Sequence, residues 1–320
     1  MATISRVREP MADAALGFLE SLDAGARAAT RYPLAREYHR DWHYVPRSPR
    51  PGLALKHMSG EQRDLVFRLL ASALSERGVQ RVREILVLEK VLGELTQRQE
   101  FRDPQNYALA IFGDPAGSAP WAWRFEGHHI SLTFTIAPGR GVAVTPAFFG
   151  ANPATVPPHH EHAGLRPLAV KQDLAFDLLA DLDPTQRRTA ILQSDSFRDI
   201  LTGPGREDSL RRPQGLALEA MTAAQRDQIL RLVEHYARNM RADLAEPALR
   251  ALHEAGAEKL HFAWAGATTP GTRHYYRLHG PTLLVEYDNT EPNHTHTVWH
   301  DPRDGFGDDL LRRHHEHAHR

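Results

Sequence analysis

The chain of 320 residues repeats two of its own segments. Residues 55–70 read LKHMSGEQRDLVFRLL, and residues 218–233 read LEAMTAAQRDQILRLV. The two segments share a methionine followed by a serine or threonine, then Gln-Arg-Asp, and the same apolar positions. Residues 123–134 match residues 276–287; they read WRFEGHHISLTF and YRLHGPTLLVEY. Repetition of segments in the same order marks related structural units. We therefore predict an internal duplication.

Each copy is expected to place helices before strands. Ser59 with Gln62, and Thr222 with Gln225, have the spacing of a capping box, which starts a helix. Gly78 is expected to end the first helix after Ser59. Helices are predicted at 1–40, 58–78, 81–95, 169–181, 184–192, 221–240, 244–255 and 305–320. Strands are predicted from apolar runs between glycine and proline turns, at 102–113, 121–127, 128–136, 141–150, 258–265, 272–279, 281–288 and 294–300.

These elements predict an α+β protein that forms a single unit over residues 1–320. Two related halves, roughly 40–150 and 215–305, are joined by a helical segment at 151–214. Each half is too small to bury its own sheet face. The antiparallel sheets of the two halves are therefore expected to associate, with the helices outside.

Composition limits the classes of partner. The net charge is -1 with neutral histidines, so we expect neither nucleic acid nor an anionic membrane surface as a partner. The sequence has no apolar run long enough to cross a bilayer. The chain has no cysteine, which excludes disulfides and thiolate chemistry and fits a cytoplasmic protein. Its 20 histidines leave imidazole as the abundant metal-binding side chain.

Side chains able to bind a metal gather in residues 285–307, VEYDNTEPNHTHTVWHDPRDGFG. Alternate side chains of a strand share a face, so His294, His296 and His300 are expected to project together. Two imidazoles two residues apart on a strand can reach one cation, and neutral imidazole is the commonest metal ligand. We therefore predict a metal site that includes His294 and His296.

A third ligand is expected from the pair His128-His129 in the first half. Alternation along the repeat places His129 on the face that corresponds to Glu286 and Asp288 in the second half. His128 falls on the apolar face, where a hydrogen-bonded histidine is the more frequent outcome. If the polar face lines a cleft between the halves, these groups converge. If it faces solvent, the histidines are solvated residues of an edge strand.

Three carboxylates are candidates for catalysis. Asp288 and Glu286 could serve as a base or a fourth ligand, and Asp304 could orient an imidazole N–H group. The cation is expected to be divalent, with zinc favoured and iron, manganese or copper as other possibilities. The tail at 314–320, HHEHAHR, is expected to be solvated, although it would bind metal weakly. The role of the proline-rich loop 150–168 stays open.

Motifs of the chain resemble an uncharacterised bacterial family, domain of unknown function 3500. The resemblance covers the chain from about Trp42 to Leu311. It is carried by EGHH at 126–129, by the FFGANPA stretch, and by NHTHTVWHD at 293–301. It implies that the EGHH and NHTH stretches belong to one pattern, and it implies no established activity. The sequence departs from the pattern at His300, where an arginine is expected.

These observations favour a metal-dependent enzyme that hydrolyses its substrate with a metal-bound water, at a site between the two halves. Iron or copper on the same ligands would instead support an oxidoreductase. A non-catalytic ligand-binding or scaffold protein is the alternative from another class. The sequence lacks dinucleotide, P-loop, G-x-S-x-G and H-E-x-x-H motifs. A small organic, partly apolar substrate is expected from the aromatic residues near the site, which are Trp121, Trp123, Tyr275, Tyr276 and Trp299.

Overall fold

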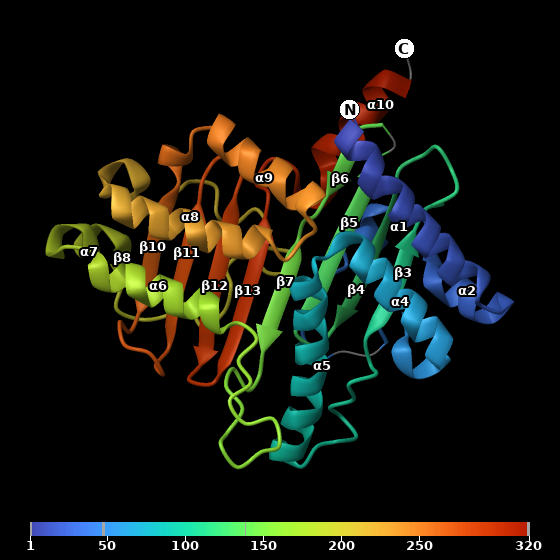
Figure 1. Ribbon diagram of the computed structural model, residues 1–320, viewed down its shortest axis with the longest axis horizontal. Coiled ribbons are helices and arrows are strands. Elements are labelled where there is room, and N and C mark those ends of the chain that lie inside the picture. The colour runs from blue at the N-terminus through green and yellow to red at the C-terminus, as the bar shows by residue number, and fades with distance from the viewer. Residues whose placement is uncertain (1, 47–48, 138, 319–320) are drawn as a thin grey trace. The chain divides into compact units, whose positions relative to one another are not determined.

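The computed structural model describes residues 2–46, 49–137 and 139–318 (Figure 1). The chain divides into two compact units. The first unit comprises Met1–Ala147, Asn239–Ala245 and Asp304–Arg320, and the second comprises Phe148–Arg238 and Glu246–Arg303. Each unit contains helices and strands, which confirms the predicted α+β class. The internal duplication and the association of two halves stay predictions.

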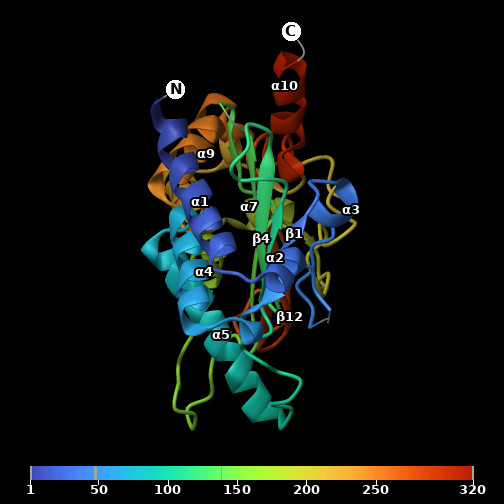
Figure 2. The ribbon, with the colours of Figure 1, turned by 90° about the vertical axis from the view of Figure 1, so that its right-hand side faces the viewer.

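In the first unit, helices pack on a mixed sheet. Its strands run in the order β1-β3-β4-β5, with β2 paired to β3 and β6 paired to β5. In Figure 1, α1, α4 and α5 lie across β3–β5, and in Figure 2, α3 lies on the other side of β4 from α4. The elements are α1 (Ala2–Glu20), α2 (Ala24–Thr30), β1 (Arg31–Tyr32), α3 (Arg36–His39), β2 (Leu53–Ala54), the 3-10 turn η1 (Leu55–His57), α4 (Gly60–Ala73), α5 (Glu76–Thr96), β3 (Ala108–Phe112), β4 (Trp121–Gly127), β5 (Ile130–Ala137), β6 (Gly141–Ala143), η4 (Gly305–Gly307) and α10 (Asp308–Ala318).

The second unit has the same kind of architecture. Its strands run in the order β7-β13-β12-β11-β10-β8, with β9 paired to β10. Figure 1 shows α6 and α8 across β10–β13. The elements are β7 (Ala147–Ala151), α6 (Ala169–Asp181), α7 (Pro184–Ala190), β8 (Ile191–Gln193), β9 (Leu216–Ala217), η2 (Leu218–Ala220), α8 (Ala223–Ala237), α9 (Ala242–Glu254), η3 (Ala257–Lys259), β10 (His261–Gly266), β11 (His274–His279), β12 (Leu284–Glu291) and β13 (His294–His300).

Both predicted capping boxes are present. The Ser59 hydroxyl accepts from the Gln62 backbone N–H at the start of α4, and the Gln62 side chain accepts from the Ser59 N–H. Thr222 and Gln225 make the same reciprocal pair at the start of α8. Each box satisfies two of the N–H groups that a helix leaves unpaired at its start.

The expected helix end at Gly78 is wrong. The α4 helix ends earlier, and Ser75 caps α5, whose first turn contains Gly78. A Cβ atom at position 78 would lie 2.1 Å from the Asn239 carbonyl oxygen. That carbonyl accepts the Ser75 N–H at 3.0 Å. Gly78 therefore permits a close backbone approach and does not end a helix.

The strand expected at 141–150 is interrupted, and the sheets are not purely antiparallel. Residues 141–143 form β6 and residues 147–151 form β7, with Pro146 between them. Proline has no N–H group to continue a strand ladder. At the edges, β1 pairs with β3 and β8 pairs with β10 in parallel.

A buried histidine of the second unit gives a testable pH dependence. His274 is fully buried and stacks on Trp264 with 5.3 Å between ring centroids. Burial lowers the pKa of His274 to about 4. In the unfolded chain, this residue takes up a proton as the pH falls below about 6.5. The stability associated with neutral His274 is therefore present at pH 7 and is lost as the pH falls toward 4.

We expect His274→Phe to lose less unfolding free energy than the wild type between pH 7 and pH 4.5. The free energy of unfolding of the wild type should fall more steeply than that of His274→Phe, by up to roughly 1.4 kcal/mol per pH unit between pH 7 and pH 4.5. Urea unfolding at both pH values measures it. Replacement of the exposed His253 by Phe is the control and should follow the wild type. Equal pH dependence in wild type and His274→Phe would show that His274 is not the source.

Candidate metal centre

His294 and His296 lie two positions apart on β13, and their rings meet. The two Nε2 atoms are 3.0 Å apart, and the ring centroids are 4.6 Å apart in an edge-to-face arrangement. His296 is 7% exposed and His294 is half-buried. The ring of buried Phe148 lies 5.4 Å from that of His296 and provides an apolar neighbour. Two Nε2 atoms that converge in this way can give their lone pairs to one cation.

Asp199 fixes the orientation of His296. Its Oδ1 atom lies 2.8 Å from His296 Nδ1 and also accepts the Ile200 N–H at 2.8 Å. A carboxylate at Nδ1 keeps the proton on that nitrogen, which leaves the Nε2 lone pair for a metal. Asp199 was not among the residues that the sequence indicated for the site. Its partner is 97 positions away, so no local pattern could have indicated the contact.

His129 occupies a tight turn and not the strand on which it was predicted. It lies between β4 and β5 with a φ of 65°, and its N–H donates to the Tyr44 carbonyl at 3.0 Å. Its ring stacks on that of His128, with 3.7 Å between centroids. His129 is 2% exposed. His129 therefore does not follow the alternation of strand faces, because the backbone turns there.

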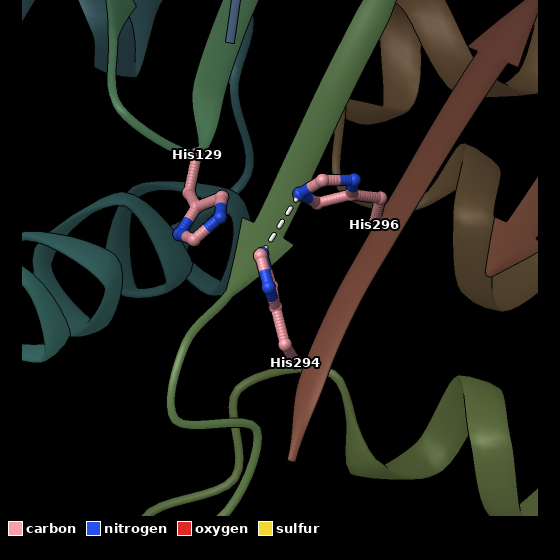
Figure 3. Close-up of side chains that lie close together, drawn as sticks. All are labelled: His129, His294 and His296. Carbon is pink, nitrogen blue, oxygen red and sulfur yellow. Dashed lines mark hydrogen bonds between the residues drawn. The ribbon is translucent and has the colours of Figure 1, made fainter. Parts of the chain in front are cut away.

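One ring nitrogen from each of His129, His294 and His296 lies within 4.8 Å of those of the other two (Figure 3). Among the described residues, this is the group in which three or more histidine or carboxylate side chains lie close enough together to hold one metal ion. Nitrogen ligands about 2.1 Å from a tetrahedral zinc ion stand roughly 3.4 Å apart. Three close histidines could bind a metal.

His128 has a different set of partners. Its Nδ1 is hydrogen-bonded to the Glu89 carboxylate, and Arg102 Nη1 lies 3.1 Å from the same nitrogen. Arg102 also pairs with Glu89 at 3.8 Å. His128 is therefore part of a charged network at the end of α5 and is not a member of the three-histidine group.

Glu286 is fully buried and its carboxylate is saturated with hydrogen bonds. It accepts the Leu201 N–H at 2.7 Å and the Thr202 N–H at 2.8 Å. The Thr202 and Tyr275 hydroxyls also donate to it. These partners use the lone pairs that a metal or a substrate proton would need. The hydrogen bonds favour an anchoring role for Glu286.

Asp288 lies opposite His296 in the pairing of β12 with β13. Its Oδ2 accepts the Ser196 hydroxyl at 2.9 Å, and its Oδ1 has no hydrogen-bond partner. Burial raises the pKa of Asp288 to about 8. The carboxyl group therefore holds the loop at Ser196 and favours its protonated form in this environment.

Asp304 and His300 have structural partners. Asp304 Oδ1 accepts the N–H groups of Asp309 at 2.9 Å and Leu310 at 3.1 Å, at the start of α10. His300 Nε2 lies 3.2 Å from the Thr202 carbonyl, and burial lowers the pKa of His300. Neither residue belongs to the three-histidine group.

The aromatic residues expected to contact a substrate are mostly core residues. Trp121, Trp123, Tyr275 and Tyr276 are at most 1% exposed. Trp299 alone of the five is partly exposed. Four of the side chains are enclosed by the packing of their own strands, and the small organic, partly apolar substrate stays a prediction.

Two other histidine-rich segments lie outside the group. In loop 150–168, the His160 and His162 rings stack with 5.7 Å between centroids. In the C-terminal tail, α10 ends at Ala318, and His319 and Arg320 lie outside the described residues. The solvated tail stays a prediction, and the role of loop 150–168 stays open.

Comparison with protein families gives one match over nearly the whole chain. Comparison with curated proteins and with solved structures gives no match. In the described part of the chain, no helix is both long and apolar enough to span a membrane. The family model described as "protein of unknown function (DUF3500)" matches residues 5–308, and the chain therefore belongs to that family, as its EGHH and NHTH motifs suggested.

Proposed function

We propose that the protein is a metal-dependent enzyme in which His129, His294 and His296 bind one divalent cation. The close approach of the three ring nitrogens is the observation that carries this proposal. Asp199 supports it, because a carboxylate behind a ligand histidine is the usual partner in such sites. Zinc is favoured since all three donors are imidazoles; iron, manganese and copper are the other candidates.

Hydrolysis is the favoured reaction. A cation with three histidine ligands keeps a position for water and can lower the pKa of that water to near 7. The protein would contribute the neutral ligand set, the orientation of His296 by Asp199 and the apolar contact of Phe148. Iron or copper on the same ligands would favour an oxidoreductase instead.

We assign Glu286 and Asp288 to holding the segment 196–202 and not to proton transfer. Their hydrogen bonds to this segment support the assignment. Asp199 lies in this segment and contacts His296. Glu286 and Asp288 therefore help to position the residue that orients His296.

We also propose that the chain arose by internal duplication. The order β2-η1-α4-α5-β3-β4-β5 corresponds to β9-η2-α8-α9-β10-β11-β12, with η3 added between α9 and β10. The short strands β1 and β8 each follow a helix that has an aspartate N-cap. Strand β1 pairs in parallel with β3, and β8 pairs in parallel with β10. Arg27 Nε donates to Leu19 O at 2.9 Å, as Arg187 Nε does to Leu179 O at 2.8 Å. Shared local contacts of this kind support a common origin.

The metal proposal is tested on full-length protein in which the four tail histidines are replaced by Gln. This background removes adventitious binding by His314, His315, His317 and His319. We expect one equivalent of zinc by elemental analysis. Because each ligand contributes a direct bond, we expect His294→Ala and His296→Ala each to weaken zinc affinity by at least about 100-fold in a competition titration.

His261→Ala is the matched control, since His261 lies at the start of a strand and its Nδ1 bonds only to the Lys259 carbonyl in the described structure. It should bind zinc as the parent does. Protein without metal, with unchanged melting in both ligand variants, would favour the non-catalytic alternative.

Asp199→Ala tests the orientation of His296. Loss of the carboxylate frees the Nδ1 proton, so zinc affinity should fall by about 10- to 100-fold while the fold is retained. The dissociation constant by competition and the melting temperature measure the two effects. Asp195→Ala, an exposed aspartate in the same loop, should leave the affinity unchanged. Equal affinities in both variants would remove Asp199 from the site.

A further inference from the structure

A cavity of about 470 Å³ opens beside the segment that carries Asp199. Its walls come from three parts of the second unit: the loop after β8, the β10–β11 connection and the end of β12. Its polar lining includes Ser194, Asp195, Ser196, Arg198, Thr272 and Arg273. Two arginines and one aspartate therefore give the cavity a net positive charge.

No ion pair joins either guanidinium to a carboxylate of the described residues, although the positive charge of Arg273 acts on the buried Asp288. Within the described residues, no aspartate or glutamate lies within 4.0 Å of the Arg198 or Arg273 side-chain nitrogens. Both arginines are exposed, and both line the cavity. The planar guanidinium binds carboxylate and phosphate oxygens through paired N–H groups. Two such groups on one cavity favour an anionic ligand.

The backbone at Arg198 is strained, which is a second and independent observation. Its φ is 67°, in the left-handed region that residues with a Cβ rarely adopt. The turn sends Arg198 to the cavity and the next residue, Asp199, to His296. Strain of this kind persists where surrounding contacts hold it, and it is concentrated at functional sites.

The surrounding contacts are strong on both sides of Arg198. Before it, the Ser196 hydroxyl donates to Asp288. After it, the Leu201 and Thr202 N–H groups donate to Glu286. One part of the cavity wall and the partner of His296 thus lie on the same hydrogen-bonded segment.

We propose that this cavity binds the anionic group, a carboxylate or a phosphate, of the substrate. Arg198 and Arg273 provide the charge, and the segment 196–202 sets the distance from the bound group to His296. The assignment of the ligand as substrate rests on the proposed metal-dependent function. The anion site itself does not depend on a metal.

The test uses full-length protein treated with a chelator, so that a metal cannot bind the probe. Inorganic phosphate and succinate are titrated calorimetrically at low ionic strength. We expect saturable binding of at least one probe, and the stronger binder identifies the preferred anion. Arg198→Gln and Arg273→Gln should each weaken it by at least about 10-fold. Arg231→Gln on α8 is the charge-matched control and should change little.

Each outcome decides the proposal. No saturable binding by the wild type, or equal weakening in all three variants, overturns the anion site. Equal melting temperatures exclude unfolding as the cause of lost binding, as expected for exposed positions. If His294→Ala and His296→Ala abolish zinc binding but not phosphate binding, both sites stand. If zinc never binds while the arginine variants still lose the anion, the proposed enzyme fails and the anion site remains.

Discussion

Two buried carboxylates on β12, Glu286 and Asp288, hold the segment 196–202 against the sheet, and the candidate site depends on these hydrogen bonds. A buried carboxylate is costly to remove from water unless donors satisfy its oxygens. The segment supplies donors to both oxygens of Glu286 and to Oδ2 of Asp288, and the strand in turn holds the segment in place. As a result, Asp199 meets a histidine and Arg198 reaches the cavity.

The first unit uses the same physical device. Glu126 on β4 is 1% exposed and accepts the His43 N–H at 2.7 Å and the Arg50 guanidinium at 2.8 Å. Arg124 and Ser131 complete its contacts at 3.2 and 3.0 Å. In each unit, a buried glutamate on a central strand thus collects backbone and side-chain donors from a long connection. Truncation of either carboxylate would leave several buried donors unpaired.

Local patterns predicted much of the secondary structure and part of the site. Helix α6 was predicted with its observed bounds, and strand β13 likewise. Both predicted capping boxes formed, because they need only residues three positions apart. The pairing of His294 with His296 followed from strand alternation alone. Gly78 was misread, since the Asn239 carbonyl that requires a glycine there comes from a distant segment.

The sequence by itself determined the α+β class, the family and the two adjacent histidines of β13, because these depend on spacing and motifs along the chain. Only the tertiary structure decided that His129 occupies a turn, that Glu286 is an anchor and that Asp199 is the partner of His296. These roles depend on hydrogen bonds between residues that are far apart in the sequence. Side-chain type shows what a residue can bind, but folding selects the partner it meets.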